Sequence, residues 1–246
     1  MTRELQVVNI EEIDIINTTI KDFLQYHLYP RLNRKQQSFI VLADTATLMR
    51  ANRDRTYKQI IQSADYVVPN GEGIMGAAKY RKQPFIERIE AYEVILDLLQ
   101  FAEVQGLSCY ILGGKDYINE KAVLKIEKRF PNVRIAGHQH GSISLENPQI
   151  AEDIKKANPD LIFISLKKGK QEQWIAAHKN QIPKGMFIGV GESLELLADE
   201  RKRTPQQWKR LNLEWLYRLF QNPSRFGQTM GKIKFFLHLI LKSKKG

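Results

Sequence analysis

Glycines recur in this sequence where apolar runs of strand length end. Gly113 and Gly114 end one such run, and Gly189 and Gly191 end another. Because glycine has no Cβ, the backbone at these turns can approach a phosphate closely and direct N–H groups at it from the start of the next helix. One turn of this kind is weak evidence, since glycine also simply makes turns. Several at one edge of a sheet favour a nucleotide-type ligand.

Side chains that could bind or act on such a ligand stand after the same apolar runs. They are Asp44, Asn70, Glu72, His138, His140, Lys170, Gln171 and Glu192. The two histidines are isolated ring bases in an expected loop, where a solvated or structural role is more common than catalysis. Neither the full dinucleotide-binding fingerprint nor the lysine motif of P-loop ATPases occurs. The sequence therefore argues against an NAD enzyme and against an ATPase of that class.

Predicted strands alternate with predicted helices along the chain. The strands are expected at 5–10, 38–43, 66–68, 108–112, 133–136, 161–165 and 186–190. Helices are expected at 90–104, 117–130 and 147–157, with another between the first two strands. This alternation predicts an α/β fold with a mostly parallel, Rossmann-like sheet and helices on both faces. Ligands of such sheets bind at the carboxyl ends of the strands, where the glycines and polar side chains stand.

The net charge of +11 is confined to the last fifth of the chain. Residues 201–246 contain 12 Lys and Arg but one acid, Glu214, whereas residues 1–200 are neutral overall. From about Thr204 onward, only helices are expected. We therefore predict two parts, an α/β domain at 1–200 for a nucleotide-type ligand and a helical, basic appendage at 201–246.

Nucleic acid and an anionic membrane surface both attract such a basic segment. The helical period favours the membrane, because six apolar side chains from Met230 to Leu241 fall within one arc of about 140° and most lysines lie opposite. Phe235 and Leu239 fall outside this arc and leave further apolar surface on the helix. The charge also lacks the interleaved aromatic side chains on which single-stranded nucleic acids stack. We expect an interfacial helix on anionic lipid and no nucleic-acid partner. The alternative is a core helix packed on its own domain.

Other features limit where the protein can act. The single cysteine, Cys109, can form neither an internal disulfide nor a paired-cysteine zinc site. The first residues lack the apolar stretch of a signal peptide, and no segment reaches the roughly 20 apolar residues that span a bilayer. The expected location is therefore the cytoplasm.

Motifs in a fixed order resemble those of the WecG/TagA/CpsF family of bacterial glycosyltransferases, glycosyltransferase family 26. The most specific stretch is residues 213–220, Leu-Glu-Trp-Leu-Tyr-Arg-Leu-Phe, followed by Pro-Ser-Arg at 223–225. The others are Glu87-Arg88-Ile89, Ile111-Leu112-Gly113-Gly114, Asn158-Pro159-Asp160-Leu161, Lys170-Gln171-Glu172 with Trp174, Gly189-Val190-Gly191 and Lys202-Arg203-Thr204-Pro205. The similarity runs from about residue 5 to residue 240.

The resemblance implies an inverting, metal-independent hexosyltransferase without a cofactor. Such enzymes move an N-acetylmannosamine-type sugar from UDP to a polyprenyl-diphosphate-linked acceptor in the synthesis of wall teichoic acid, enterobacterial common antigen or capsule. They work at the inner face of the cell membrane, where a C-terminal appendage brings them. Members often assemble, so the expected partners also include further copies of the chain or a partner glycosyltransferase.

The resemblance also assigns binding residues. Arg88 and Gln171 align with residues around the substrate diphosphate and sugar, and Arg218 and Arg225 would reach the site from the appendage. Arginine suits this role because its forked guanidinium meets two phosphate oxygens at once. The alternative is that Arg88 and Arg218 pair with surface acids.

The sequence departs from the family where chemistry would occur. The family's third strand ends in Asp-Gly, and that aspartate is the proposed general base, whereas this chain has Asn70-Gly71. An amide has no basic lone pair at pH 7 and cannot take a proton there. Asp44 and Glu72 are carboxylates absent from the usual pattern, and both stand beside Asn70. They are the candidates for a base that has moved.

Further departures affect the expected donor pocket. Glu192 replaces a glycine, and its carboxylate would face any anion bound by that turn. Ser165 and Lys167 stand where the family has glycines.

Two functions follow. The first is an active glycosyltransferase with a moved base, and the second is a degenerate relative that acts as a binding or scaffolding partner of another glycosyltransferase. We favour the first, because a lost base typically costs only ~10²–10⁴-fold in rate.

Overall fold

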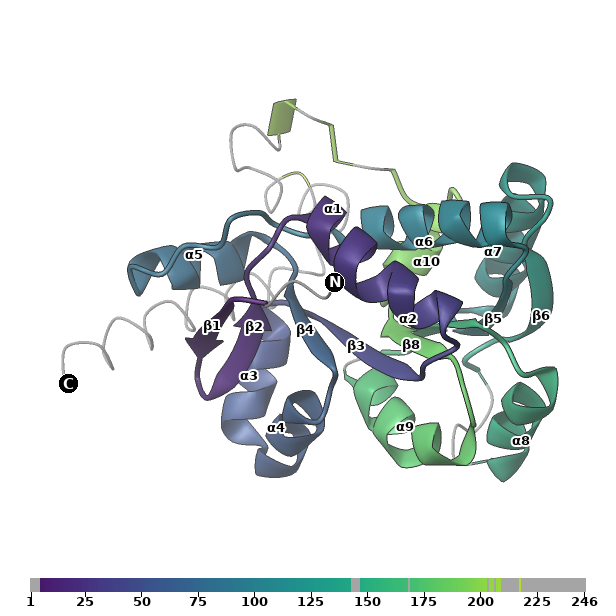
Figure 1. The fold of residues 1–246 in the computed structure, drawn as a ribbon, viewed down its shortest axis with the longest axis horizontal. Helices are drawn as coiled ribbons and strands as arrows, with labels where there is room; N and C mark the ends of the chain where they lie inside the picture. The colour runs from purple at the N-terminus through teal and green to yellow at the C-terminus, as the bar shows by residue number, and fades with distance from the viewer. Residues whose placement is uncertain are drawn as a thin grey trace.

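The computed structural model describes residues 5–142, 147–167, 169–202, 204–205, 207–208 and 217. Within these residues, six strands form one parallel sheet in the order β4-β3-β8-β7-β5-β6 (Figure 1). They are β3 (Ser38–Ala43), β4 (Tyr66–Pro69), β5 (Ser108–Gly113), β6 (Arg134–Gln139), β7 (Leu161–Ser165) and β8 (Met186–Gly189). The predicted α/β class with a mostly parallel sheet is confirmed.

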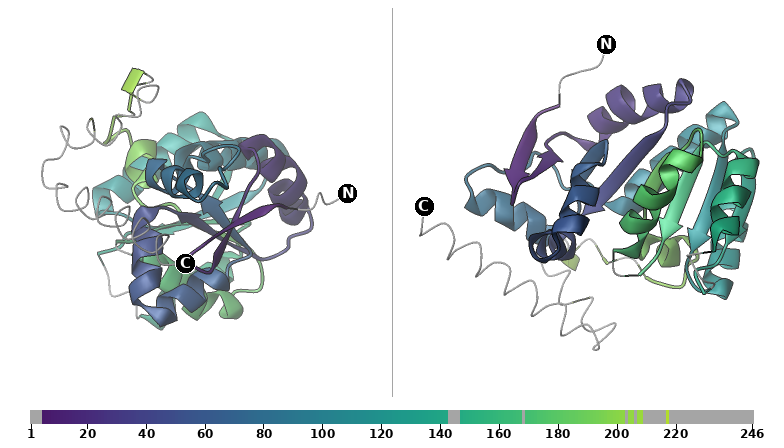
Figure 2. Two further views of the ribbon diagram at one scale, coloured as in Figure 1. Left: turned by 90° about the vertical axis from the view of Figure 1, so that its left-hand side faces the viewer. Right: turned by 90° about the horizontal axis from the view of Figure 1, so that it is seen from below.

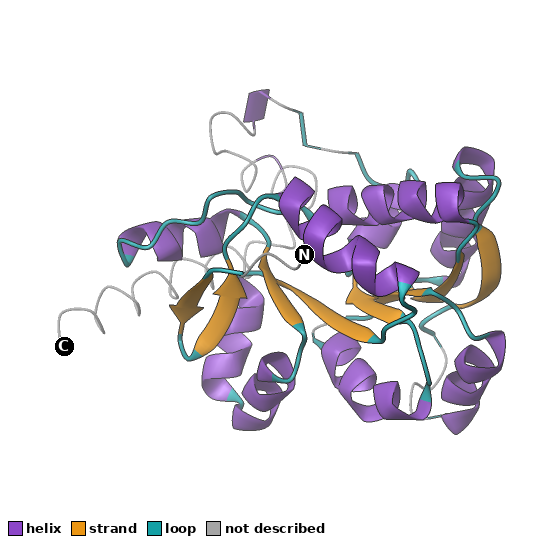
Figure 3. Cartoon of the chain, in the orientation of Figure 1, coloured by secondary structure: helices purple, strands orange, loops and turns teal. Residues whose placement is uncertain are grey.

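Helices connect these strands, as Figure 3 shows. The three helices predicted from the sequence correspond to α6 (Ala91–Gln105), α7 (Asp116–Arg129) and α8 (Pro148–Ala157). The others described are α1 (Ile20–Phe23), η1 (Leu24–Leu28), α2 (Tyr29–Asn33), α3 (Thr45–Arg53), α4 (Arg55–Gln62), α5 (Glu72–Tyr80), α9 (Lys170–His178), η2 (Lys179–Gln181) and α10 (Ser193–Leu197). The continuous run of α1, η1 and α2 accounts for the helix expected between the first two predicted strands.

The first predicted strand is present, but it does not join the parallel sheet. β1 (Val7–Ile10) instead pairs antiparallel with β2 (Ile13–Ile16), which the sequence had not indicated. The two residues between them, Glu11 and Glu12, have φ values of 54° and 66°. Positive φ at both central residues is the geometry of a tight two-residue hairpin turn, so the chain reverses at once.

Two apolar cores cover the two faces of the sheet. Alternate residues of β3 divide between them, with Ile40 and Leu42 in one core and Phe39 and Val41 in the other. The first core lies under α1, α2, α6, α7 and α10, and the second lies under the β1–β2 hairpin, α3, α4, α5, α8 and α9. Figure 2 shows helices on both sides of the sheet. Burial on both faces explains why these strands are apolar along their whole length.

The predicted appendage falls almost entirely outside the described residues. The interfacial helix expected between Met230 and Leu241 lies there, as do Arg218 and Arg225. The boundary near residue 200 therefore stays a prediction. Among the described residues, no helix has the length and apolar character needed to cross a membrane.

Asp160 ties together the amino ends of three strands. Its Oδ2 accepts hydrogen bonds from the backbone N–H and the hydroxyl of Ser108, at 2.9 and 2.8 Å, and Lys184 Nζ lies 2.6 Å from its Oδ1. The backbone carbonyl of Asp160 also accepts the N–H of Met186 at 2.9 Å. Burial alone would raise the pKa of this carboxyl, but the bonds from Lys184 and Ser108 outweigh it and lower the pKa. The carboxylate is thus a fixed part of the fold.

We predict that Asp160→Ala lowers the free energy of unfolding by about 2–3 kcal/mol, because it leaves charged and buried donors without an acceptor. Urea denaturation at neutral pH measures the change. The control is Glu152→Ala, which breaks an exposed pair with Lys155 at 3.5 Å and should cost less than about 1 kcal/mol. Equal losses in the two variants would contradict the structural role of Asp160.

Candidate functional site

The strand order brings the ends of β4, β3 and β8 side by side. Ala43 pairs with Pro69, and the N–H of Asn70 donates to the carbonyl of Ala43 at 2.8 Å. Asp44 and Asn70 are therefore neighbours across two strands, and the turn after β8 lies on the other side of Asp44. Residues far apart in the sequence meet at one edge of the sheet, as expected for a parallel fold.

Arg88 lies between two carboxylates at this edge. Its Nη1 pairs with Glu72 and its Nη2 pairs with Glu90, and the arginine side chain is only 15% exposed. The loop that carries Arg88 is fixed to the end of β4, since the N–H of Ile89 donates to the carbonyl of Pro69 at 3.1 Å. The structure thus brings together two predicted site residues, Arg88 and Glu72. It adds Glu90, which the sequence reasoning missed although it stands only two positions after Arg88.

Glu72 occupies the first turn of α5, directly after the turn at Gly71. Gly71 has a φ of 96°, which favours glycine, and this turn starts the helix right after Asn70. A carboxylate in the first helical turn is stabilised by the helix dipole. Glu72 is therefore placed by the helix start and held there by Arg88.

Asp44 has a different local role, because it caps the start of α3. Its Oδ1 accepts the backbone N–H of Thr47 at 2.9 Å and the Thr47 hydroxyl at 3.2 Å. The Thr47 hydroxyl in turn accepts the N–H of Asp44 at 3.4 Å, which completes a capping box. One oxygen of this candidate base is thus committed to the fold.

Gln171 and the glycine turn after β8 form the next part of the edge. The Oε1 of Gln171 accepts the N–H of Gly191 at 3.1 Å, and its Nε2 donates to Glu172 at 2.7 Å. A Cβ on Gly189 would lie 2.5 Å from the Gln171 amide. Gly189 is therefore needed to admit the glutamine side chain. The N–H of Gly191, expected to face a phosphate, is bound by Gln171 in this structure.

The two family departures beside this turn also have structural roles. The hydroxyl of Ser165 donates to the carbonyl of Gly191 at 2.8 Å and joins β7 to the turn. The carboxylate of Glu192, expected to face a bound anion, forms an ion pair with Arg201. Its charge is thus partly compensated from within the protein.

The Gly113-Gly114 turn lies farther along the sheet. A Cβ on Gly113 would meet the carbonyl oxygen of Ser165 at 2.1 Å, and the N–H of Gly114 donates to that same oxygen at 2.9 Å. These glycines permit close approach of β5 and β7. Four strand spacings separate β5 from β4, which is roughly 19 Å, so a ligand that touches both this turn and Asn70 must be extended.

One of the two histidines does not lie where the sequence analysis expected, whereas His140 follows β6 in a loop as expected. β6 extends to Gln139, so His138 is on a strand rather than in a loop. Its Nδ1 lies 2.8 Å from Oδ1 of Asn119, and Nδ2 of that buried side chain donates to the carbonyls of Gly113 and Gln139 at 2.7 and 3.2 Å. His138 thus belongs to a network that holds the Gly113 turn.

A buried acid that the sequence reasoning left without a role lies behind Gln171. Glu172 is 3% exposed, faces the Tyr57 hydroxyl, and has an Oε2 atom without a hydrogen bond among the described residues. Burial is the main reason that the pKa of this carboxyl is raised, against the opposing bonds from Gln171 and Tyr57. The Tyr57 ring is in turn covered by the guanidinium of Arg50 at 4.1 Å. A sequence motif could locate Gln171-Glu172 but not this burial.

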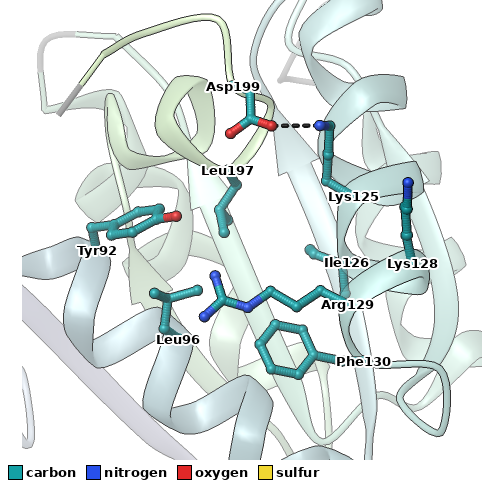
Figure 4. Close-up of a pocket in the computed structure, with 9 residues that line it drawn as sticks. All are labelled: Tyr92, Leu96, Lys125, Ile126, Lys128, Arg129, Phe130, Leu197 and Asp199. Carbon is teal, nitrogen blue, oxygen red and sulfur yellow. Dashed lines mark hydrogen bonds and ion pairs between the residues drawn. The ribbon is translucent and has the colours of Figure 1, made fainter.

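A separate cavity of about 320 Å³ lies between α6, α7 and the segment after α10. Figure 4 shows the Arg129 guanidinium directed into it and Lys125 paired with Asp199 at its rim. Its lining comes from α6, α7, α10 and the residues that directly follow α7 and α10, and not from the carboxyl ends of the strands, so we do not include it in the candidate site. Within the part of the chain that the structure describes, no group of three or more His, Cys, Asp or Glu residues could hold a metal ion. The expected independence from metal stays a prediction.

Comparison with known proteins adds an independent observation to this geometry. The model of the glycosyl transferase WecG/TagA/CpsF family matches residues 8–246. The chain belongs to this family. Similar proteins include the N-acetylglucosaminyldiphosphoundecaprenol N-acetyl-beta-D-mannosaminyltransferases of Staphylococcus aureus strains MW2 and NCTC 8325 / PS 47. Each is 34% identical over 239 residues, which cover 97% of this chain and 93% of the relative. The resemblance seen in the motifs is confirmed.

In this member of the WecG/TagA/CpsF family, the motifs single out one arginine and one glutamine for ligand binding. Arg88 and Gln171 both lie at the carboxyl edge, each bound to an acid of the same chain. The assignment of individual roles stays a prediction.

We predict that Glu172→Gln changes how stability depends on pH. Because burial raises the pKa of Glu172 above its ordinary 4.5, its contribution to stability is complete below that value and is lost as pH rises through the folded-state pKa. Glutamine does not ionise, so the variant should gain stability relative to the natural protein between about pH 4 and pH 8. Urea denaturation across this range measures the difference. The control Glu152→Gln, at an exposed position, should show the same dependence of unfolding free energy on pH as the natural protein. Equal dependence in all three proteins would contradict the prediction.

Proposed function

We propose that this chain is a glycosyltransferase of the membrane surface. It moves an N-acetylhexosamine-type sugar, similar to N-acetylmannosamine, from a UDP-sugar to a polyprenyl-diphosphate-linked acceptor in cell-wall or surface polysaccharide synthesis. The observation that carries this proposal is 34% identity over 97% of the chain to proteins named for such a transfer. A peripheral position on the inner face of the cell membrane, with the basic appendage as anchor, belongs to the same proposal.

The geometry supports an extended donor along the carboxyl edge. Backbone N–H groups of Gly114 and Gly191 are already bound within the protein, so charged side chains must supply most of the diphosphate binding. Arg88 is the described residue that suits this role, because its fork can exchange carboxylate oxygens for phosphate oxygens. Arg218 and Arg225 would add to it from the appendage.

The reaction is a single displacement at the sugar. The acceptor hydroxyl oxygen attacks the anomeric carbon, and the bond from that carbon to the β-phosphate oxygen breaks. UDP leaves with the electron pair, while the hydroxyl proton passes to a base. Arg88 stabilises the negative charge that grows on the leaving phosphate. Attack from the face opposite UDP inverts the anomeric configuration.

Glu72 is the better placed of the two candidate bases. A diphosphate at Arg88 brings negative charge next to Glu72 and Glu90, and like charges disfavour each other at close range. Binding of the donor therefore draws Arg88 away from Glu72 and releases a carboxylate two residues from Asn70. Asp44, by contrast, is held by Thr47 at the start of α3. Glu72 would then take the proton that Asn70 cannot accept.

We predict that Arg88→Ala weakens UDP binding about 30-fold, the equivalent of about 2 kcal/mol for a lost charge-assisted pair with phosphate. Isothermal titration calorimetry with UDP measures the affinity. Arg88→Lys keeps the positive charge but loses the forked guanidinium, so its UDP affinity should lie between those of the natural protein and Arg88→Ala. Arg129→Ala removes a guanidinium in the separate cavity and should bind UDP like the natural protein. Unchanged UDP affinity in folded Arg88→Ala would mean that Arg88 only pairs with acids of the protein and does not bind the diphosphate.

We predict that Glu72→Gln lowers kcat by roughly 10²–10⁴-fold, the usual effect of losing a general base. Asp44→Asn should retain most of the activity, because an amide oxygen can still accept the Thr47 bonds. Asn70→Asp should change the rate little, since a base is already present. The assay measures sugar transfer from a panel of UDP-sugars to a short-chain polyprenyl-diphosphate acceptor.

The same assay separates the alternatives. No transfer from any UDP-sugar by the natural protein would favour the scaffolding function that Asn70 leaves open. A large gain from Asn70→Asp alone would contradict the moved base, because it would mean a pocket intact except for one missing carboxylate.

A further inference from the structure

Most large apolar side chains of the described residues are buried, and a few are clearly exposed. The exposed ones are Val7, Tyr80, Ile86, Val104, Tyr117 and Leu124. Tyr80 and Ile86, which are 38% and 62% exposed, both belong to the segment 79–86. We call this segment the α5 tip, because it contains the end of α5 and the loop that follows.

The loop of the α5 tip is held in place. The N–H of Ile86 donates to Oδ1 of Asn17 at 2.7 Å, and Nδ2 of Asn17 donates to the carbonyl of Pro84 at 3.4 Å. Phe85 is buried at 6% exposure and packs into the second core. A buried phenylalanine thus anchors the loop while the next residue, Ile86, is displayed to solvent. Contact of an isoleucine side chain with water is unfavourable, and at this position the side chain adds nothing to the core.

The charges of the α5 tip are cationic and partly uncompensated. Lys79 and Lys82 have no ion-pair partner among the described residues, and Arg81 between them pairs with Glu11 at 2.9 Å. The exposed apolar residues of α7 stand among charges of both signs. Lys121 and Lys125, next to Tyr117 and Leu124, are paired with Glu200 and Asp199, and the other cations of this helix stand among its acids Asp116, Glu120 and Glu127. Residues 79–82, by contrast, contain three cations and no acid.

The α5 tip also has a defined position relative to the candidate site. α5 begins directly after Gly71, and the chain returns from the tip to Arg88. The helix has nine residues, so the tip lies roughly 13 Å along the helix from the site. Figures 1 and 2 show α5 projecting from the body of the protein at the end of the sheet where β4 and the hairpin lie.

We propose that the α5 tip is a lipid-contact surface, in which Tyr80 and Ile86 enter the headgroup region of an anionic membrane and Lys79 and Lys82 bind its phosphates. Tyrosine prefers such an interface because its ring is apolar and its hydroxyl is polar. Lysine side chains can lay their methylene stems on the apolar layer while the ammonium groups stay at the headgroups. This inference rests on the proposed function in one respect, that the acceptor is lipid-linked.

The composition of the surface favours a membrane over a folded protein partner. A stable protein interface buries about 800 Å² on each side, far more than two exposed side chains provide. A membrane requires no matching shape, and clustered lysines beside apolar groups are sufficient for attraction to anionic lipid. Docking here would place the site close to the surface from which a lipid-linked acceptor sugar extends. The acceptor could then reach the carboxyl edge while its polyprenyl chain remains in the bilayer.

The test uses the single cysteine of the chain. Cys109 is fully buried and its pKa is raised to about 12 by burial, so it should resist labelling. Ile86→Cys and Leu124→Cys then each accept one environment-sensitive fluorophore at positions of matched exposure, 62% and 63%. With full-length protein and vesicles of phosphatidylcholine containing about one-third phosphatidylglycerol, the label at 86 should shift to shorter wavelength and brighten. The label at 124 should not change.

A second measurement tests the lysines. Lys79→Gln with Lys82→Gln should weaken vesicle binding roughly tenfold or more, because each lysine near an anionic surface contributes about fivefold. The matched control, Lys155→Gln with Lys156→Gln, removes two charges from α8 and should weaken it much less. An unchanged label at 86, an equal shift at 124, or equal loss in both lysine pairs would overturn the proposal.

Failure of this proposal is distinguishable from failure of the proposed function. The vesicle measurements need neither a sugar donor nor turnover. A chain that transfers sugar to a short-chain acceptor in solution, but leaves the label at 86 in water, is a glycosyltransferase without this lipid contact. A chain that inserts the label but transfers nothing has the contact without the activity.

Discussion

A parallel sheet covered on both faces restricts where this protein can place polar chemistry. β3 is buried at every position, and its neighbours carry apolar side chains into the cores on both sides. Polar groups within these strands would lose their hydration without compensation. They therefore collect at the strand ends, where the chain turns into the next helix. The strand order then decides which ends meet, and it places those of β4, β3 and β8 together.

At these strand ends, charged and polar groups of the protein already pair with one another. Arg88 is paired with Glu72 and Glu90, Glu192 is paired with Arg201, and Gln171 binds the N–H of Gly191. A ligand that binds here must replace interactions of this kind rather than fill an empty place. Its net affinity is then the difference between new and old bonds. This explains why residues that suit diphosphate binding also look like ordinary surface ion pairs when no ligand is considered.

The sequence predicted the class of fold because periodicity and strand length depend on local composition. It also located Asp44, Asn70 and Gly191 at one edge, since parallel strands share a direction. It failed for β1, whose composition is that of a strand but whose partner depends on the tight turn at Glu11 and Glu12. It also placed His138 in a loop, because β6 is an edge strand without the apolar run that marks the central strands.

The sequence could not predict which side chains pair with one another across the fold. Nothing local indicates that Glu90 shares Arg88 with Glu72, that Glu192 meets Arg201, or that Glu172 is buried against Tyr57. These contacts depend on loops whose paths are set by tertiary packing. They also change the meaning of single residues. Gly113, which resembles a phosphate-binding turn in sequence, is needed for the approach of β5 to β7.

Asn70 and the Arg88 cluster together suggest how the order of binding could be controlled. A permanent carboxylate at position 70 would be available to the acceptor hydroxyl whether or not a donor were present. The carboxylate of Glu72 is paired with Arg88, and under the proposed function a diphosphate would compete for that guanidinium. Proton transfer would then follow donor binding, because the same arginine serves both anions. Under the proposed function the amide at position 70 is not a defect, because Glu72, in the first turn of α5, would supply the base once the donor is bound.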